Sequence, residues 1–200
     1  MHKINLSLLA LFLLTSFSSV SAHNLKESIE SSDRTPSYKA RDSYRHPYET
    51  LNFFGIKQDM TVIELNPSGG WYTEILANYI HYPGTLIAAQ GSYYLKRFEK
   101  KMNSDPMYGR VEIVNLNSDL GEPNSVDAVI TFRNLHNWLG PQMDSIFGNS
   151  FKTLKPGGIF GVVEHRAIPD TDLETMKKSG YVTEEHAIEV ALKNGFELVA

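Results

Sequence analysis

Short apolar runs alternate with longer amphipathic segments along most of this chain, from about residue 60 onward. This alternation is typical of β-α units built around a mostly parallel sheet. The apolar runs predict strands at 61–65, 85–89, 111–114, 126–132, 159–164 and 196–199. The amphipathic segments, bounded by Gly, Pro, Asn or Asp, predict helices at 72–80, 93–102, 143–154 and 184–193. The pattern therefore predicts a three-layer α/β fold with a mostly parallel central sheet.

The first 22 residues follow a different pattern. Lys3 precedes an uncharged apolar run over residues 4–17, and small polar residues then lead to Ala22. This order is typical of a secretory signal peptide. The run is shorter than the roughly 20 residues that a membrane-spanning helix needs, although an uncleaved N-terminal anchor remains the alternative. We therefore expect a signal peptide over 1–22, a periplasmic or secreted protein, and no stable membrane insertion after cleavage.

The rest of the chain divides at about residue 42. Residues 23–42 are mostly polar and offer few side chains to a core, so they predict a flexible arm. Pro47 then begins a short helical pattern that Gly55 ends. We expect one domain over residues 43–200.

Composition narrows the function classes. Without residues 1–22 the chain keeps 178 residues (200 − 22) and a net charge of −5 (18 − 23), so no nucleic-acid partner is expected. The absence of cysteine excludes disulfides, thiol nucleophiles and cysteine-based zinc sites. The histidines lack a paired ligand spacing, so we predict no metal. A Gly-x-Ser-x-Gly turn, typical of α/β serine hydrolases, is also missing.

The most informative segment runs from residue 61 to 72. It reads as a buried strand, a turn of small residues and the start of a helix, which is the order found in ligand cradles. Gly69 and Gly70 allow the backbone to approach a ligand, and the helix start offers free N–H groups. A tight β-α turn without a ligand is the other interpretation of these residues.

This segment resembles the first motif of the class I S-adenosylmethionine (SAM) dependent methyltransferases. Glu64 occupies the acidic position, and the family's alternating glycines fall on Asn66, Ser68 and Gly70. Tyr44-Arg45-His46-Pro47 and the segment Phe132-Arg133-Asn134-Leu135-His136-Asn137-Trp138 resemble a group of predicted exported methyltransferases of unassigned substrate. The similarity extends over nearly all of the chain beyond the predicted signal peptide.

The resemblance implies a Rossmann-like methyltransferase fold, SAM as cofactor and a methyl acceptor that the sequence does not identify. It implies a sheet that lacks the family's final antiparallel strand, because the chain stops after 196–199. Gln90 stands where the family has an acid that binds the ribose, and Asp119 lies in the segment that meets the adenine. The implied cofactor-binding residues are Glu64, Asn66, Ser68, Gly69, Gly70, Gln90, Asp119 and Asn134.

Two histidines are candidates for the chemistry. His136 follows the strand at 126–132 and His165 follows the strand at 159–164, so both lie at the carboxyl edge of the predicted sheet. Parallel α/β sheets bind their ligands at this edge, and an imidazole can act as a general base. Each histidine has a purely structural or solvated interpretation as well. Because two of the family's three glycines and its ribose-binding acid are replaced, a non-catalytic ligand-binding protein derived from a methyltransferase is the alternative function.

Overall fold

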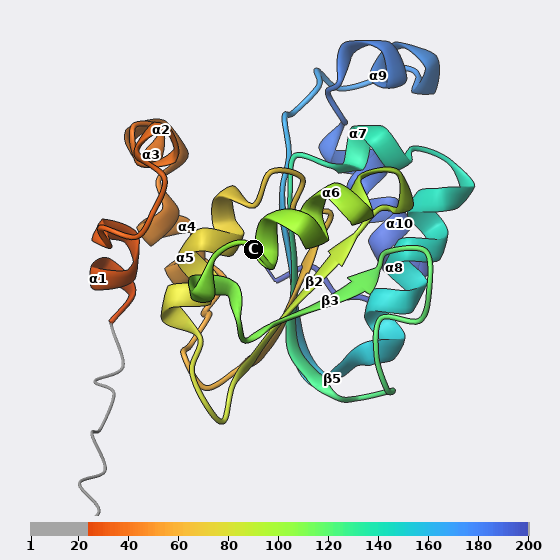
Figure 1. The fold of residues 1–200 in the computed structure, drawn as a ribbon. Coiled ribbons are helices and arrows are strands. Elements are labelled where there is room, and N and C mark those ends of the chain that lie inside the picture. Colours follow the sequence, from red (N-terminus) through yellow and green to blue (C-terminus); the bar gives the residue numbers. More distant parts are fainter. Residues whose placement is uncertain (1–23, 200) are drawn as a thin grey trace, which may run out of the picture.

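A computed structural model describes residues 24–199, so the predicted signal peptide lies outside the described residues. Helices surround a central sheet in a three-layer α/β arrangement (Figure 1). In chain order the elements are α1 (Leu25–Glu30), α2 (Pro36–Lys39), α3 (Asp42–Arg45), α4 (Pro47–Phe53), β1 (Thr61–Leu65), α5 (Trp71–Tyr79), β2 (Thr85–Gln90), α6 (Ser92–Met102), the 3-10 turn η1 (Pro106–Tyr108), β3 (Val111–Asn115), β4 (Val126–Phe132), α7 (Leu135–Trp138), α8 (Pro141–Thr153), β5 (Leu154–Val163), α9 (Leu173–Ser179) and α10 (Glu184–Lys193).

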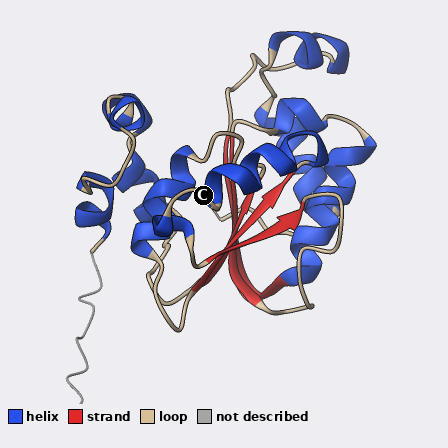
Figure 2. Ribbon diagram, viewed as in Figure 1, coloured by secondary structure: helices blue, strands red, loops and turns tan. Residues whose placement is uncertain are grey.

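The described sheet has five strands in the order β3-β2-β1-β4-β5, and every pairing is parallel (Figure 2). At the carboxyl end of β1, Leu65 lies between Ala89 of β2 and Thr131 of β4. The strand order reverses at β1, because the chain first adds strands on one side and then on the other. Open α/β sheets bind ligands at such a switch point. The parallel sheet is confirmed, and its switch point lies at the predicted turn.

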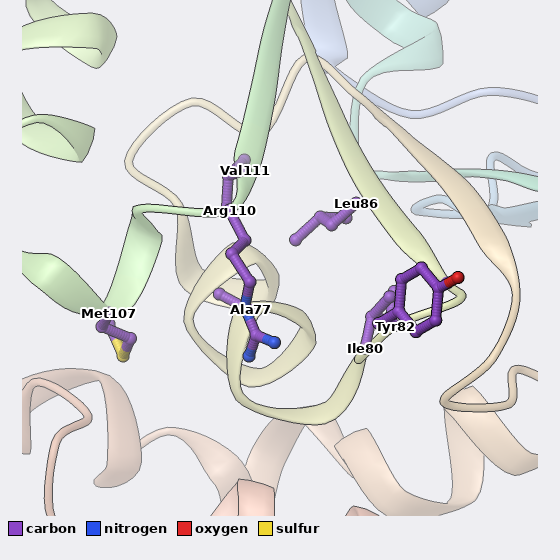
Figure 3. A pocket seen from close by; sticks show the side chains of 8 residues that line it. Ala77, Ile80, Tyr82, Leu86, Met107, Arg110 and Val111 are labelled. Atoms are coloured by element: carbon purple, nitrogen blue, oxygen red, sulfur yellow. The ribbon is translucent and has the colours of Figure 1, made fainter. Parts of the chain in front are cut away.

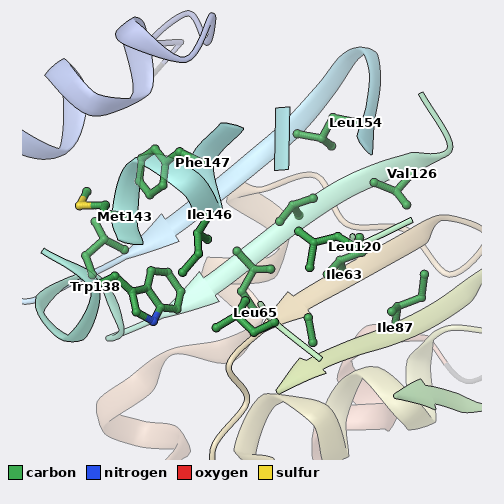
Figure 4. Close-up of a cluster of buried hydrophobic side chains, with 14 of the residues drawn as sticks. Ile63, Leu65, Ile87, Leu120, Val126, Trp138, Met143, Ile146, Phe147 and Leu154 are labelled. Atoms are coloured by element: carbon green, nitrogen blue, oxygen red, sulfur yellow. The ribbon is translucent and has the colours of Figure 1, made fainter. Parts of the chain in front are cut away.

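The core has a large cluster on each face of the sheet because side chains alternate along each strand. Val62 packs with Leu51 of α4 and Ile75 of α5 in one cluster. Ile63 and Leu65 face the other side, where they join side chains of α7 and α8, including Trp138 and Phe147 (Figure 4). The two clusters fix the sheet between its helical layers.

Most predicted boundaries agree with the structure to within one or two residues. Helix α10 has the predicted bounds, while β5 begins five residues earlier than the predicted start at Ile159. A register shift between Val126 and Ala128 accommodates the turn residues that precede Ile159. Helices α7 and α9 were not predicted, because each is too short to show a helical period in the sequence.

The prediction of a flexible arm over 23–42 is wrong for the described part of that segment. Its polar residues form α1 and α2, and α1 lies against α5. Arg34 is almost fully buried; its guanidinium donates to both carboxylate oxygens of Asp42 at 2.7 and 3.0 Å and to the Ile29 carbonyl at 2.6 Å. Polar composition suggested exposure, but paired polar groups can be buried.

The predicted strand at 196–199 is also wrong. Gly195 has a φ of 95°, and the Phe196 amide donates to the Ala191 carbonyl at 3.1 Å, so this segment ends helix α10. The ring of Phe196 stacks on Phe160 of β5 with centroids 4.8 Å apart. Val199 is 90% exposed and pairs with no strand. Phe196 packs its side chain against the core beside β5, so the apolar run at 196–199 is not the strand that was predicted.

Candidate functional site

Two asparagines join the strands on either side of the switch point. Asn66 follows β1 and donates from its side-chain amide to the side-chain oxygen of Asn134, which follows β4, at 2.9 Å. The Asn134 amide in turn donates to the carbonyls of Leu65 and Asn66 at 3.3 and 3.2 Å, and to the Thr131 hydroxyl at 3.1 Å. Asn134 is buried, so these contacts hold the turn after β1 against the end of β4.

Gln90, at the end of β2, completes this network. Its side-chain amide donates to the Asn66 side-chain oxygen at 2.9 Å, and its side-chain oxygen accepts from the Ser68 amide at 3.0 Å. The side chain is fully buried. Gln90 therefore holds the turn after β1 through Asn66 and Ser68. Its side-chain amide and its side-chain oxygen both form hydrogen bonds within the protein.

The turn has left-handed backbone at three alternate positions, two of which are not glycine. Asn66, Ser68 and Gly70 have φ values of 49°, 55° and 84°, all in the left-handed region. Asparagine tolerates this region better than most residues, whereas serine is strained there. Strain of this kind persists where surrounding contacts impose it and is concentrated at functional sites. The contacts from Gln90 and Asn134 impose it here.

Gly69 is held from the outer side of the turn. Its carbonyl accepts from the Tyr38 hydroxyl at 2.9 Å and from the Lys101 ammonium at 2.6 Å. A Cβ at Gly69 would lie 2.7 Å from the Tyr38 hydroxyl oxygen, so a larger residue here would displace the end of the Tyr38 side chain. A hollow of about 570 Å³ lies beside this contact, between α2, the turn and α6, and Tyr94 and Arg97 contribute to its wall. Ligand pockets commonly have this size.

Glu64 lies under the turn, on the α5 side of β1. Its carboxylate accepts a hydrogen bond from the Thr73 hydroxyl at 2.6 Å, and the residue is only 2% exposed. Burial raises the pKa of the Glu64 carboxyl to about 7, against the opposing effects of the Thr73 hydrogen bond and the nearby Lys101 charge. Glu64 thus anchors the first turn of α5, in contact with another side chain of the protein.

His136 is paired with a carboxylate that the sequence interpretation did not include. Its Nδ1 lies 3.1 Å from an oxygen of Glu164, and its backbone amide donates to the same oxygen at 3.4 Å. The Glu164 side chain is mostly buried and fixes the ring. A carboxylate at Nδ1 favours the tautomer with its proton there, which leaves Nε2 as a proton acceptor. The pair has the arrangement of an oriented general base.

His165 is near this pair without sharing its hydrogen bond. Its backbone amide donates to the other oxygen of Glu164 at 2.8 Å, and its ring lies against Tyr181 with centroids 5.1 Å apart. The His165 carbonyl accepts from the Val182 amide at 2.9 Å. His165 thus connects the end of β5 to the segment after α9.

Asp119 is not brought to the Asn66–Gln90–Asn134 network. It is exposed, and its carboxylate lies 3.6 Å from the Lys152 ammonium of α8. A different polar group occupies the ends of β2 and β3. Ser92 and Asn115 exchange hydrogen bonds at 3.0 and 3.2 Å, and the Asn117 amide donates to Ser92 at 3.2 Å.

The sequence interpretation therefore missed Glu164 and the Ser92–Asn115–Asn117 group. A signal for both was present, since all of these residues lie at strand ends or just after them at the same sheet edge. Tyr38 and Lys101 gave no such signal, because they lie on helices whose packing against the turn depends on the fold.

The small cavity beside Leu86 and Tyr82 has a volume of about 20 Å³, enough for about one water (Figure 3). Within residues 24–199, no group of three His, Cys, Asp or Glu side chains is arranged to hold a metal ion. No helix in the same part of the chain is long and apolar enough to cross a membrane.

Comparison by sequence finds no matching family model and no matching curated protein. Solved structures do match. A SAM-dependent methyltransferase from Aquifex aeolicus aligns with a TM-score of 0.66 at 17% identity, over 89% of this chain and 91% of that one. The [4+2]-cyclase SpnF aligns with a TM-score of 0.59 at 18% identity, over 78% of this chain and 58% of the cyclase.

An arsenic(III) SAM methyltransferase from Chlamydomonas reinhardtii also aligns, with a TM-score of 0.53 at 17% identity, over 70% of this chain and 52% of that one. At such identities the likeness concerns the fold alone. The inclusion of a cyclase illustrates that one fold supports different reactions. This chain has a methyltransferase-like Rossmann fold with a five-stranded, all-parallel sheet.

Proposed function

We propose that this protein is a SAM-dependent methyltransferase. One observation carries the proposal: the turn at the switch point keeps left-handed backbone at Asn66, Ser68 and Gly70, the three glycine positions of the cofactor motif. Two of these residues adopt that shape at an energetic cost. The turn lies at the switch point of a fold shared with known SAM-dependent methyltransferases, which supports cofactor binding there.

The residues fit the cofactor better at its methionine end than at its ribose. The turn from Asn66 to Gly70 and the first free amides of α5 would hold the methionine part. Gln90 already bonds the turn, so we assign it and Asn134 a positioning role. Ser92 and Asn117 would take the adenosine side in place of Asp119, since they lie at the ends of β2 and β3.

The chemistry asks little of the protein beyond alignment. SAM supplies a methyl group on a sulfonium centre, which leaves as a neutral thioether when the acceptor's electron pair forms the new bond. The chain must hold the acceptor in line and exclude water. His136 would accept the proton that the acceptor loses, at Nε2, with Glu164 stabilising the resulting charge. His165 would line the acceptor side.

We further propose that the protein acts outside the cytoplasm. The support is the N-terminal sequence alone: Lys3, the apolar run over 4–17 and the small residues before Ala22. N-terminal sequencing of the exported protein should give His23 as the first residue. Recovery of intact Met1 would contradict the export proposal and leave the proposed chemistry unaffected.

A second candidate is a ligand-binding protein that lacks methyl transfer. The engagement of Gln90 favours it, because neither side-chain group of Gln90 is free to meet the ribose hydroxyls. In the family an acid at this position accepts both hydroxyls. A protein whose turn is locked by Gln90 could hold a smaller ligand in the same crevice.

Calorimetric titration of the purified protein with SAM and with S-adenosylhomocysteine separates the two candidates. We expect saturable binding of both compounds. No binding of either compound would contradict the methyltransferase proposal and favour the alternative.

Variants of the turn locate the binding. Gly69→Val should abolish it, but the new side chain would also meet Tyr38. The matched test is therefore Gly69→Val in a Tyr38→Ala background, compared with Tyr38→Ala alone. Loss of binding only in the double variant supports the cradle, and equal binding in both proteins would place the cofactor elsewhere.

A further inference from the structure

Arg45 lies near the switch point with two other arginines, Arg41 and Arg133, close enough for their charges to lower its pKa, and none of the three forms an ion pair with a described carboxylate. Arg41 and Arg45 are four residues apart, and the Arg45 amide donates to the Arg41 carbonyl at 3.1 Å, so the two side chains lie on the same side of α3. Like charges at this spacing destabilise a helix. Within residues 24–199 no acidic side chain forms an ion pair with either of them.

Arg133 comes from a different part of the chain, directly after β4. The Arg45 carbonyl accepts from the Tyr72 hydroxyl at 3.5 Å, and the Tyr72 ring stacks on Phe132 with centroids 3.5 Å apart. Phe132 immediately precedes Arg133, so Tyr72 contacts the backbone of Arg45 on one side and the neighbour of Arg133 on the other. Arg133 has a φ of 62°, a strained conformation for a non-glycine residue, and its amide donates to Val163 at 2.7 Å.

The contrast with Arg34 is informative, because Arg34 and Arg45 lie over the same ring. Their guanidinium carbons are 5.4 and 4.8 Å from the centroid of Trp71. Arg34 is neutralised by Asp42, whereas Arg45 has no carboxylate partner; the buried Nε atoms of both arginines lack a hydrogen-bond partner. Partial burial and the charges of Arg41 and Arg133 lower the pKa of Arg45. The protein therefore keeps unneutralised positive charge at this point.

We propose that Arg41, Arg45 and Arg133 bind an oxyanion, a carboxylate or phosphate group, carried by the methyl acceptor. Three guanidinium groups without acidic partners match such a group, because each offers paired N–H donors in one plane. The cluster is next to the proposed cofactor turn through Trp71 and Tyr72, the first residues of α5. The proposal adds to the proposed function that the methyl acceptor is negatively charged. It rests on the proposed function only in taking the molecule that carries the oxyanion to be the methyl acceptor.

The first experiment uses inorganic phosphate and does not depend on SAM. Phosphate is titrated against the protein at constant ionic strength while NMR follows the indole N–H signals of Trp71 and Trp138, the two tryptophans. We expect a saturable shift of Trp71, which contacts Arg45, and little change at Trp138, which lies on the other face of the sheet. Absence of a saturable Trp71 shift would overturn the proposal.

The variants are Arg41→Gln and Arg133→Gln, singly and together, because both side chains are exposed and their loss should leave the fold intact. We expect the double variant to weaken phosphate binding at least fivefold. Arg110→Gln is the matched control, since it removes the same charge just before β3, at the opposite edge of the sheet. An equal loss in Arg110→Gln would mean general attraction and would overturn the site.

A second experiment tests whether the oxyanion belongs to the cofactor. S-adenosylhomocysteine carries a carboxylate, and 5′-methylthioadenosine has the same nucleoside without the amino-acid group. We expect the Arg41→Gln/Arg133→Gln protein to bind both compounds like the wild type. Selective weakening of S-adenosylhomocysteine would assign the cluster to the cofactor and overturn the acceptor proposal. If the wild type bound neither compound, the proposed function would fail while the phosphate result still decided the oxyanion site.

Discussion

The buried carboxylate of Glu64 accepts a 2.6 Å hydrogen bond from the hydroxyl of Thr73, one turn into α5. This contact joins β1, which precedes the turn over residues 66–70, to α5, which follows it, so it fixes the turn at both ends. It also keeps an acidic group in the core, where the pKa of Glu64 rises from 4.5 to about 7. The stability of the protein should therefore depend on pH through this one side chain.

Glu64→Gln should remove that dependence. Because the pKa of Glu64 is higher in the folded state, its effect on stability is most favourable below about pH 4.5, declines as pH rises to about 7 and is constant above. The free energy of unfolding of the variant, relative to that of the wild type, should therefore be about 3 kcal/mol higher above pH 7 than at pH 4.5. Urea unfolding at several pH values measures this difference. Glu122→Gln, an exposed acid, is the control, and a parallel pH dependence in Glu64→Gln and wild type would contradict the assignment.

Gln90→Leu should destabilise the protein by about 1–3 kcal/mol, because it leaves the Ser68 amide without a partner and the Asn66 side-chain oxygen with only the 3.4 Å hydrogen bond from the Gly91 amide. The apolar replacement has a similar size, so the change reports mainly on hydrogen bonding. Chemical denaturation gives the loss. The exposed Gln142 of α8 provides the comparison, and Gln142→Leu should change stability by less than about 0.5 kcal/mol. A similar effect at both positions would mean that Gln90 does not support the turn.

Asp42→Ala should cost about 2–4 kcal/mol, because it leaves the buried guanidinium of Arg34 without its carboxylate. The figure is reduced from that of a fully buried pair since Asp42 is partly exposed. Thermal or urea unfolding measures the loss, with Glu174→Ala in the exposed Lys177 pair as a control of less than about 1 kcal/mol. An equally small loss at both positions would show that the N-terminal helices do not depend on this pair.

The neutral ring of His136 should carry its proton on Nδ1, toward Glu164. Nitrogen chemical shifts of the imidazole distinguish the two tautomers. Glu164→Ala should shift the ring toward the Nε2-protonated form that is usual for an unconstrained histidine, while Glu174→Ala, at a distant exposed acid, should leave it unchanged. An Nε2-protonated ring in the wild type would contradict the assignment of Nε2 as the proton acceptor.

The sequence predicted the sheet well, because its buried strands are continuous apolar runs that few other elements produce. It failed where polar residues are buried in pairs, as with Arg34 and Asp42, since composition alone gives their exposure and not their partners. It also failed at Phe196, because a short apolar run can be either a strand or a loop that packs an apolar side chain on the core. The hydrophobic pattern of the sequence identifies strands and helices, whereas the partner of each side chain is known only from the folded structure.

The candidate site was predicted in position more than in role. Asn66, Gln90 and Asn134 meet at one place, as the shared sheet edge implied, but they bond to one another. The side-chain oxygen of Gln90 accepts a hydrogen bond from the Ser68 amide at 3.0 Å. The sequence does not show this contact, because it depends on the path of the backbone through the turn. Glu164 could have been predicted from its place at the same edge of the sheet. Phe132 pairs with Val163, so the residues that follow β4 and β5 lie close together.

The shared carbonyl of Gly69 makes the N-terminal helices sensitive to the state of the turn. Tyr38 of α2 and Lys101 of α6 both bond this oxygen, so any rotation of the Gly69 peptide breaks both contacts at once. Thermodynamic linkage then requires that a ligand which reorients this peptide also loosens the attachment of α2, and that loosening α2 alters affinity for that ligand by the same factor. Hydrogen exchange at the Tyr38 and Lys39 amides would therefore report whether a ligand occupies this turn, without an assay of turnover.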